Sequence, residues 1–353
     1  MAPRLVASGR RFDRTVSAAG RRFRAACALT PVSHARSAPP GGGTSSQRLV
    51  VVVAALAVLV AVAAGVLLAI QLWGRGHSSS AAGTPDRPPR PVPSPRPSSA
   101  PPPAPARHRD PFGPAAAALA ASRPGAVLAA VYDLSTGQAW SLGHGRPQAE
   151  ASVVKLDILE TLLARNRGAS PAIPAADAPI ARLMIEDSDN DAATTLWYTA
   201  GGPAQIASYN AAAGLRHTTM SRCVDCPGFP WPGWGLTTTT PADQILLLRQ
   251  LVAPSPLLTA AQRGYALSLM ERVTPSQRWG VSARVPRHVM VALKNGWLPL
   301  NSADSDWQVN SVGWISGDRR DYLLAVLTTG NATEQDGIDV ISRLAAIVWR
   351  NMR

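Results

Sequence analysis

An uninterrupted apolar segment near the start of the chain is the strongest feature of its hydrophobic pattern. Residues 49–70 contain no charge and no proline, and Trp73 follows them. A run of this length can span the hydrocarbon core of a membrane as a helix, so residues 49–73 are predicted to be a transmembrane helix. A cleaved signal peptide is the alternative, but signal peptides have shorter apolar and preceding regions.

The segments on either side of this predicted span have the composition of unfolded chain. Residues 1–48 hold nine Arg and one acidic residue, which predicts a basic cytoplasmic tail. Residues 74–114 are rich in Pro, Ser, Ala and Arg, which predicts an extended linker. We therefore expect a single-pass plasma-membrane protein with a cytoplasmic N-terminus and an extracytoplasmic C-terminal domain.

From residue 115 to residue 353 the pattern becomes that of one globular domain. Short apolar stretches predict strands at 127–132, 138–142, 289–295, 307–315 and 321–329. Longer stretches predict helices at 115–122, 152–165, 175–186, 191–198, 203–213, 240–251, 259–271 and 334–350, with an irregular loop at 216–239. Strands at both ends with helices between them predict an α+β fold, in which an antiparallel sheet built from both ends of the domain accompanies an all-helical subdomain.

The charge of the chain is unevenly distributed. Lys and Arg number 35 and Asp and Glu 22, for a formal net charge of +13, and residues 1–114 supply +12 of it with 15 Arg and 3 Asp. The predicted domain holds 20 basic and 19 acidic residues, so its net charge is +1. Because the basic excess lies outside the folded part, the composition does not indicate nucleic acid binding.

Only two of the 35 basic residues are lysines, Lys155 and Lys294. Lysine differs from arginine because its ammonium can lose a proton when buried. Ser152 precedes Lys155 by three residues, so on a helix the hydroxyl and the amine share a face. At a helix N-terminus, free backbone N–H groups can stabilise an oxyanion, and burial lowers the pKa of a lysine. The pair predicts an activated serine nucleophile; a capped helix with a surface lysine is the alternative.

Two further motifs follow in a recognisable order. Ser188-Asp189-Asn190 begins 36 residues after Ser152, and Lys294-Asn295-Gly296 begins 106 residues after Ser188. Ser-x-x-Lys, Ser-Asp-Asn and Lys-x-Gly form the motif set of class A β-lactamases and the related penicillin-binding proteins. The chain from residue 115 onward resembles this family, which implies a β-lactamase/transpeptidase-like fold and a serine hydrolase.

The resemblance also implies two sets of site residues. The catalytic residues would be Ser152, Lys155, Ser188, Asn190 and Lys294. The substrate-binding residues would be Asn295, Gly296 and Trp297. Ser152 would attack the substrate and Lys155 would take its proton, while the backbone N–H groups of Ser152 and Trp297 would form the oxyanion hole. The resemblance implies no metal and no other cofactor, and its substrate would be a β-lactam or a D-Ala-D-Ala-type peptide.

The sequence departs from the family pattern at two points. Asn295 stands where the family has Thr or Ser, and an amide is bulkier although it can still donate to a carboxylate. The family's Glu-x-x-Leu-Asn motif, whose Glu activates the deacylating water, is absent. The acidic residues between the second and third motifs are Asp191, Asp225, Asp243 and Glu271. Asp225 is the candidate replacement base, and without one the acyl-enzyme is expected to be long-lived.

Three functions remain open on this evidence. Hydrolysis of β-lactams is what the resemblance most directly implies. A D-Ala-D-Ala carboxypeptidase or a cell-wall amidase or esterase would use the same residues. The missing Glu also fits a penicillin-binding or wall-peptide sensor module that does not turn over.

The irregular loop at 216–239 carries two further signals. Cys223 and Cys226 are expected to form a small disulfide outside the membrane, with zinc binding and a thioredoxin-like role as alternatives. Phe229, Trp231 and Trp234 are expected to pack this loop against the domain, or else to form a platform for glycan or peptide. Glu150, just before the nucleophile, is expected to be a surface charge.

Overall fold

The computed structural model describes residues 109–227, 229–300 and 306–352. The predicted tail, the predicted transmembrane helix and most of the predicted linker lie outside these residues. None of the helices within the described ranges is long and apolar enough to cross a membrane. Phe112 is only 1% exposed, so the folded body begins slightly before the predicted boundary at residue 115.

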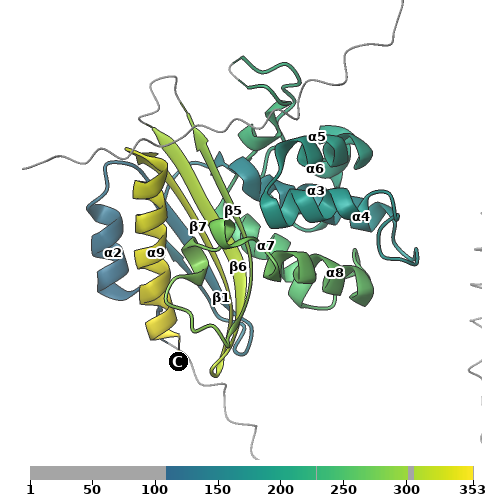
Figure 1. The fold of residues 1–353 in the computed structure, drawn as a ribbon. Coiled ribbons are helices and arrows are strands. Elements are labelled where there is room, and N and C mark those ends of the chain that lie inside the picture. Colours follow the sequence, from purple (N-terminus) through teal and green to yellow (C-terminus); the bar gives the residue numbers. More distant parts are fainter. Residues whose placement is uncertain (1–108, 228, 301–305, 353) are drawn as a thin grey trace, which may run out of the picture. The chain divides into compact units, whose positions relative to one another are not determined.

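The described residues form an α+β structure, as the sequence predicted (Figure 1). Its strands are β1 (Val127–Asp133), β2 (Ala139–Leu142), β3 (Gln148–Ala149), β4 (Thr238–Thr239), β5 (Met290–Pro299), β6 (Trp307–Gly317) and β7 (Arg320–Asn331). Its helices are α2 (Gly113–Ala121), α3 (Lys155–Arg165), α4 (Ala178–Arg182), α5 (Asn190–Thr199), α6 (Gly202–Ala212), α7 (Pro241–Val252), α8 (Ala260–Glu271) and α9 (Glu334–Asn351).

The main sheet has the order β2-β1-β7-β6-β5, and its neighbours run antiparallel. It joins the first two strands of the domain to the last three, as predicted. Strand β7 lies at the centre and is buried on both faces, because successive side chains of a strand point to opposite sides. Leu323 and Ala325 belong to one core cluster, whereas Tyr322, Leu324 and Val326 belong to the other.

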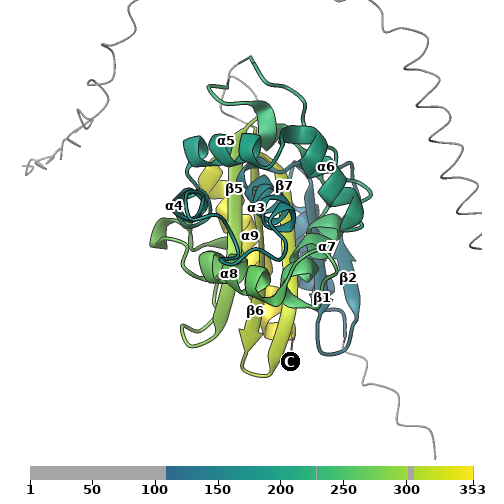
Figure 2. The ribbon, with the colours of Figure 1, turned by 90° about the vertical axis from the view of Figure 1, so that its right-hand side faces the viewer.

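Helices cover both faces of this sheet. Helices α2 and α9 pack on one face, and α3 to α8 lie on the other (Figures 1 and 2). Thr333 caps α9 by accepting a hydrogen bond from Asp336 N, and the helix buries one face that includes Val340, Ile341 and Leu344. The sheet therefore separates two hydrophobic cores, and β5 remains at the edge of the sheet beside the helical layer.

Local structure differs from the predictions in two places that matter for the site. The predicted helix at 175–186 is only the short α4, followed by a π-helical turn at Leu183–Asp187. The predicted helix at 152–165 begins with a 3₁₀ turn at Ala151–Val154 before α3. Both irregular turns lie directly beside predicted catalytic residues, and neither has a periodicity that a sequence pattern reveals.

Candidate active site

The turn that carries Ser152 is held tightly against the edge strand β5. A Cβ atom added to Gly296 would lie 2.6 Å from Ser152 N and 2.8 Å from Val153 N, so only glycine permits this approach. On the neighbouring strand, Asn310 Nδ2 donates to the carbonyl oxygens of Ala149 and Glu150, at 2.8 and 2.9 Å. The nucleophile turn is therefore fixed by backbone contacts from β5 and side-chain contacts from β6.

Lys155 lies at the first position of α3 and is fully buried. Its Nζ atom donates to the carbonyl oxygen of Ser188 at 2.5 Å and to Asn190 Oδ1 at 2.8 Å, and it lies 3.1 Å from Ser188 Oγ. The same atom lies 5.1 Å from the centre of the Trp234 ring, within the range of a cation–π contact. The first two motifs therefore meet at one amine.

Lys294 reaches the same serine from the opposite side. Its Nζ atom donates to Ser188 Oγ at 2.8 Å and to the carbonyl oxygen of Asn295 at 2.8 Å, and the residue is 1% exposed. The Ser188 hydroxyl is thus shared by the two lysines of the chain. Hydrogen bonds of the two lysines join four of the residues predicted to be catalytic, Lys155, Ser188, Asn190 and Lys294. Ser152 lines a cavity together with Asn190 and lies three residues before Lys155 in the chain.

Burial changes the ionisation of both lysines. Desolvation lowers the pKa of Lys155 to about 7, although the nearby Asp189 carboxylate opposes this shift. Desolvation also lowers the pKa of Lys294 well below its ordinary value, and repulsion from Lys155 adds to the effect. Because a charged amine loses its hydration on burial, the neutral form becomes accessible near pH 7.

An unusual backbone presents Ser188 between the lysines. Ser188 has a φ of +59°, in the left-handed region, and it directly follows the π-helical turn. Asp189 then caps α5 by accepting a hydrogen bond from Ala192 N at 2.7 Å. A non-glycine residue in this conformation costs free energy, and such strain concentrates at functional sites.

The predicted substrate-binding residues have different surroundings. The Asn295 side chain turns into the protein, where Nδ2 donates to the carbonyl oxygens of Gln277 at 2.7 Å and Trp279 at 3.3 Å. It therefore does not present its amide donor to a substrate carboxylate in this structure. Trp297 is half-buried and its ring lies 5.9 Å from that of Trp279. No local sequence pattern predicts this tryptophan pair, because its members lie 18 residues apart.

A small cavity of about 60 Å³ opens beside Ser152. Its lining residues are Ala151, Ser152, Asn190, Phe229, Trp231, Pro232, Gly233, Trp234, Gly235, Leu236, Trp297 and Leu298. None of them is a carboxylate. Asp225 is exposed and lines a separate hollow with Thr194 and Tyr198, so the structure does not bring this candidate base to the cavity.

The disulfide loop supports the aromatic wall of this cavity. Cys223 and Cys226 are bonded to each other, and Gly233 N donates to the carbonyl oxygen of Cys223 at 2.8 Å. Trp234 is 5% exposed, and its Nε1 atom donates to Thr194 Oγ1 at 3.2 Å. Trp234 therefore packs the loop against the domain, and it lines the cavity together with Phe229 and Trp231. Within the described residues no cluster of His, Cys, Asp or Glu could hold a metal ion.

Comparison with known proteins identifies a family for the C-terminal part of the chain. Residues 177–352 match the Beta-lactamase enzyme family. These matched residues, just under half of the chain, belong to this family. The chain is 27% identical to the "Putative lipoprotein LppW" of Mycobacterium tuberculosis over 241 residues, covering 66% of this chain and 73% of that protein.

Solved structures of β-lactamases share the fold of this chain. The TLA-1 extended-spectrum β-lactamase aligns with a TM-score of 0.58 and 16% identity, over 66% of this chain and 98% of that chain. The class A β-lactamase of Mycobacterium abscessus aligns with a TM-score of 0.55 and 22% identity, over 66% and 96%. The predicted β-lactamase-like fold is therefore confirmed.

The other side of the nucleophile helix carries three buried carboxyl groups that sequence reasoning missed. Glu150, Asp157 and Glu160 are each 0% exposed, so the expectation that Glu150 is a surface charge is wrong. Asn210 Nδ2 donates to Asp157 Oδ1 at 2.7 Å, and Tyr209 OH donates to Glu160 Oε2 at 2.7 Å. None of the ion pairs in the described part of the chain involves these three groups.

Because these carboxyl groups are buried without a cation, they are weaker acids than exposed carboxyl groups. Desolvation raises the pKa of Asp157 to about 7, and it raises the pKa of Glu150 and of Glu160 well above the ordinary value. The negative charge of Asp157 adds to the rise in the pKa of Glu150. Asp243 on α7 adds a further negative charge that favours the protonated form of Glu150 and Asp157.

The close approach of Gly296 predicts a specific sensitivity. Gly296→Ala should lower the free energy of unfolding by about 1–3 kcal/mol, because the new methyl group meets backbone atoms that cannot move aside. Gly264→Ala is the matched control: this position lies in α8 with nothing within 4 Å of the added Cβ, and the change should stabilise by up to about 1 kcal/mol. Urea unfolding measures both, and equal stability of the two variants would contradict the prediction.

The buried carboxyl groups predict a stability that falls as pH rises. The folded-state pKa of Asp157 lies near 7, above the unfolded value of roughly 3.9. Folding therefore takes up protons between these values, and the stability present at low pH is lost as pH rises through 7. Asp157→Asn keeps an acceptor for Asn210 and should reduce this loss by about 1–3 kcal/mol between pH 5 and pH 8, the two values compared by urea unfolding.

An exposed carboxylate provides the control for this titration. Asp191→Asn replaces a side chain at the surface of α5 and should leave the pH dependence of stability as it is in the parent protein. If Asp157→Asn and the parent lose equal stability between these pH values, Asp157 is not protonated in the folded state.

Proposed function

We propose that this protein is an extracytoplasmic serine hydrolase that is acylated at Ser152 by β-lactams or related D-Ala-D-Ala-type wall peptides. The observation that carries the proposal is the Ser188 hydroxyl, which lies 3.1 Å from Lys155 Nζ and 2.8 Å from Lys294 Nζ. Two desolvated lysines that both contact one hydroxyl form a route along which a proton can move. Lysines that served only to pack the protein interior would not require this arrangement.

The proton route follows from the donors and acceptors at Ser188. A hydroxyl has one hydrogen to donate and two lone pairs to accept. When Lys294 donates to Ser188 Oγ, the hydroxyl hydrogen is free to point toward a neutral Lys155. Lys155 as the base would take the proton of Ser152, and Ser188 would pass a proton on to the leaving nitrogen of the substrate. Lys294 would donate its hydrogen bond to Ser188 Oγ in either protonation state and so hold the hydroxyl in this orientation.

Deacylation is proposed to be slow. Among the residues that the structure describes, those that line the cavity beside Ser152 include no carboxylate to activate a water molecule. Asn295 also binds the carbonyl oxygens of Gln277 and Trp279 instead of facing the site. These features favour a long-lived acyl-enzyme, as in a penicillin-binding protein or sensor, over rapid β-lactam hydrolysis.

Attachment to the plasma membrane belongs to the same proposal. The apolar segment at 49–73 supports a single-pass anchor with the hydrolase domain outside the cell. The relative in Mycobacterium tuberculosis carries the name of a lipoprotein, which also indicates a membrane-associated protein.

The experiment that tests the proposed function is a time course of intact mass after mixing the protein with a penicillin. An adduct of the mass of the drug should form and decay slowly, and Ser152→Ala should form none. Conversion of the drug without a persistent adduct would show fast turnover instead. The absence of any adduct with penicillin and with D-Ala-D-Ala thioesters would refute acylation.

The lowered pKa of Lys155 predicts how the acylation rate depends on pH. Because the amine is neutral only above its pKa of about 7, the rate should rise roughly tenfold per pH unit from pH 5 and level off above 7. Stopped-flow measurement with a chromogenic β-lactam determines this profile. A rate that is constant across this range would exclude Lys155 as the base.

A further inference from the structure

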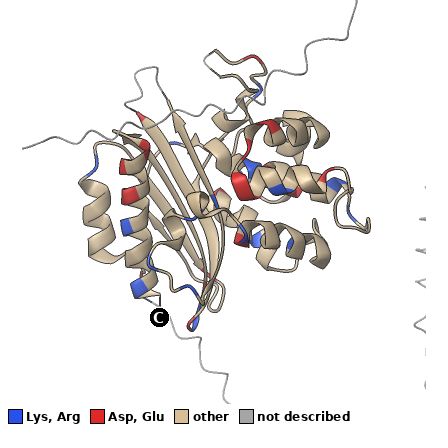
Figure 3. Ribbon diagram, viewed as in Figure 1, with Lys and Arg blue, Asp and Glu red and all other residues tan. Residues whose placement is uncertain are grey.

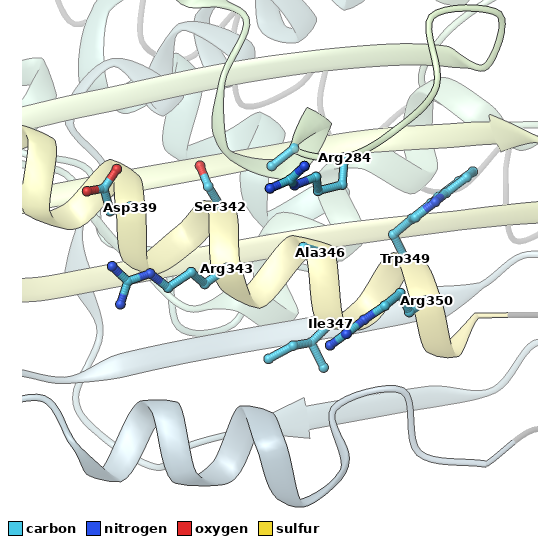
Figure 4. A pocket seen from close by; sticks show the side chains of 9 residues that line it. Arg284, Asp339, Ser342, Arg343, Ala346, Ile347, Trp349 and Arg350 are labelled. Carbon is cyan, nitrogen blue, oxygen red and sulfur yellow. The ribbon is translucent and has the colours of Figure 1, made fainter.

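The outer face of α9 carries a hollow of about 880 Å³, which shares no lining residue with the cavity beside Ser152. Three exposed arginines border it, Arg284 from the loop before β5 and Arg343 and Arg350 from α9 (Figure 4). Its floor is apolar and includes Ala346 and Ile347. The hollow therefore combines a cationic border with an apolar base.

The arginines of this border are available for a ligand. None of the ion pairs within the described ranges involves Arg284, Arg343 or Arg350. The single acidic residue of the lining, Asp339, accepts a hydrogen bond from Gln335 Nε2 at 2.9 Å. Figure 3 shows that the acidic positions of α9 lie toward its start and the basic positions toward its C-terminal end.

The positive charge continues onto the adjacent turn between β6 and β7. His288 Nε2 lies 2.9 Å from Asp318 Oδ1, which ties the loop that carries Arg284 to this turn. Arg320 Nε donates to the carbonyl oxygen of Trp349, and its guanidinium lies 4.0 Å from the centre of the Trp349 ring. We call this end of the domain, with Arg284, Arg319, Arg320, Arg343 and Arg350, the basic end.

The chain enters the domain beside the basic end. Asn351 Nδ2, at the end of α9, donates to the carbonyl oxygen of Pro111 at 2.9 Å. Phe112 belongs to the same core cluster as Ile347 and Trp349. Residues 1–108 therefore join the domain at this end. A surface to which they are attached is tethered near the basic end, and a tether raises the effective concentration of that surface.

Charge decides between the possible occupants. The chain's own residues 1–108 contain 14 Arg and 2 Asp, so they would be repelled by the basic end. An anionic surface would be attracted, and guanidinium groups bind phosphate oxygens through paired hydrogen bonds. The apolar floor suits the hydrocarbon part of an amphiphile better than it suits a fully hydrated polyanion.

We propose that the basic end docks onto the anionic phospholipid headgroups of the membrane. This proposal rests on the membrane attachment proposed above, which determines the end of the domain that approaches the membrane. The side chains of the basic end then make the contacts with the headgroups. Met290 lies near the basic end, and Gly296 follows it by six residues on β5. Gly296 packs against the backbone of Ser152. At a rise of about 3.3 Å per residue, the docked domain therefore holds Ser152 about 20 Å from the basic end. Docking would thus leave the active site open to wall peptides.

Hydrogen–deuterium exchange of the full-length protein on vesicles tests docking. The vesicles contain phosphatidylcholine alone or phosphatidylcholine with one-third phosphatidylglycerol. Peptides that cover 284–289, 317–320 and 346–352 should exchange about threefold or more slowly on the anionic vesicles in about 50 mM salt. This protection should disappear in about 500 mM salt, because salt screens charges at a surface.

Charge reversal identifies the residues responsible. Arg284→Glu, Arg343→Glu and Arg350→Glu combined should remove the protection, and the corresponding Gln variant should weaken it. The matched control reverses three exposed arginines elsewhere, Arg167→Glu, Arg216→Glu and Arg222→Glu, and should keep the protection. An unchanged thermal unfolding midpoint and penicillin adduct formation would show that the variants are folded, since none of these residues belongs to the active site.

Several outcomes would overturn docking. Protection that is equal on neutral and anionic vesicles, or that both charge-reversed proteins lose equally, would contradict it. Protection without vesicles that grows with protein concentration would assign the surface to a second copy of the chain. Protection by soluble polyphosphate but not by anionic vesicles would assign it to a soluble polyanion. Vesicle flotation on neutral lipid and penicillin acylation measure the anchor and the enzyme separately, so their failure is distinguishable from a failure of docking.

Discussion

The arrangement of the active site depends on removing two ammonium groups from water around one hydroxyl. Lys155 and Lys294 are both almost fully buried and both contact Ser188. Burying a charged amine is costly unless it is paired, so the favourable response is loss of a proton. Three distant segments must meet for this to happen: the start of α3, the turn after Leu183–Asp187 and the edge strand β5. The strained backbone of Ser188 is tolerated because each of these segments is fixed by its own packing.

The two sides of α3 carry ionisable groups of opposite type, a lysine on one side and carboxyl groups on the other, and the pKa shifts of the two sides are compatible. The lysine of the active site faces one side, and Glu150, Asp157 and Glu160 fill the other without a cation. Ionised carboxylates there would favour a charged lysine. Burial raises the pKa of these groups and so disfavours the ionised carboxylates that would raise the pKa of Lys155.

The loop at 216–239 forms much of the cavity on which the proposed acylation and deacylation would depend. It supplies the aromatic wall of the cavity and covers Lys155 with Trp234. It supplies no carboxylate to that cavity, and Asp225 lies in another hollow. The groups proposed to form an acyl-enzyme come from the helices and the sheet, whereas this loop supplies aromatic side chains to the cavity.

The sequence by itself determined the order of most strands and helices, the α+β class and the four residues that hydrogen bonds join at the candidate site, Lys155, Ser188, Asn190 and Lys294. These follow from local signals, because periodicity reports burial and the spacing of Ser152 and Lys155 reports a shared helix face. Other features depended on contacts between residues far apart in the chain, which no local pattern encodes. The orientation of Asn295 depends on the carbonyl groups of Gln277 and Trp279, and the burial of Glu150 depends on packing against α7. The basic end likewise exists only because the loop at Arg284 folds over α9, and this tertiary contact gathers arginines that the sequence leaves scattered.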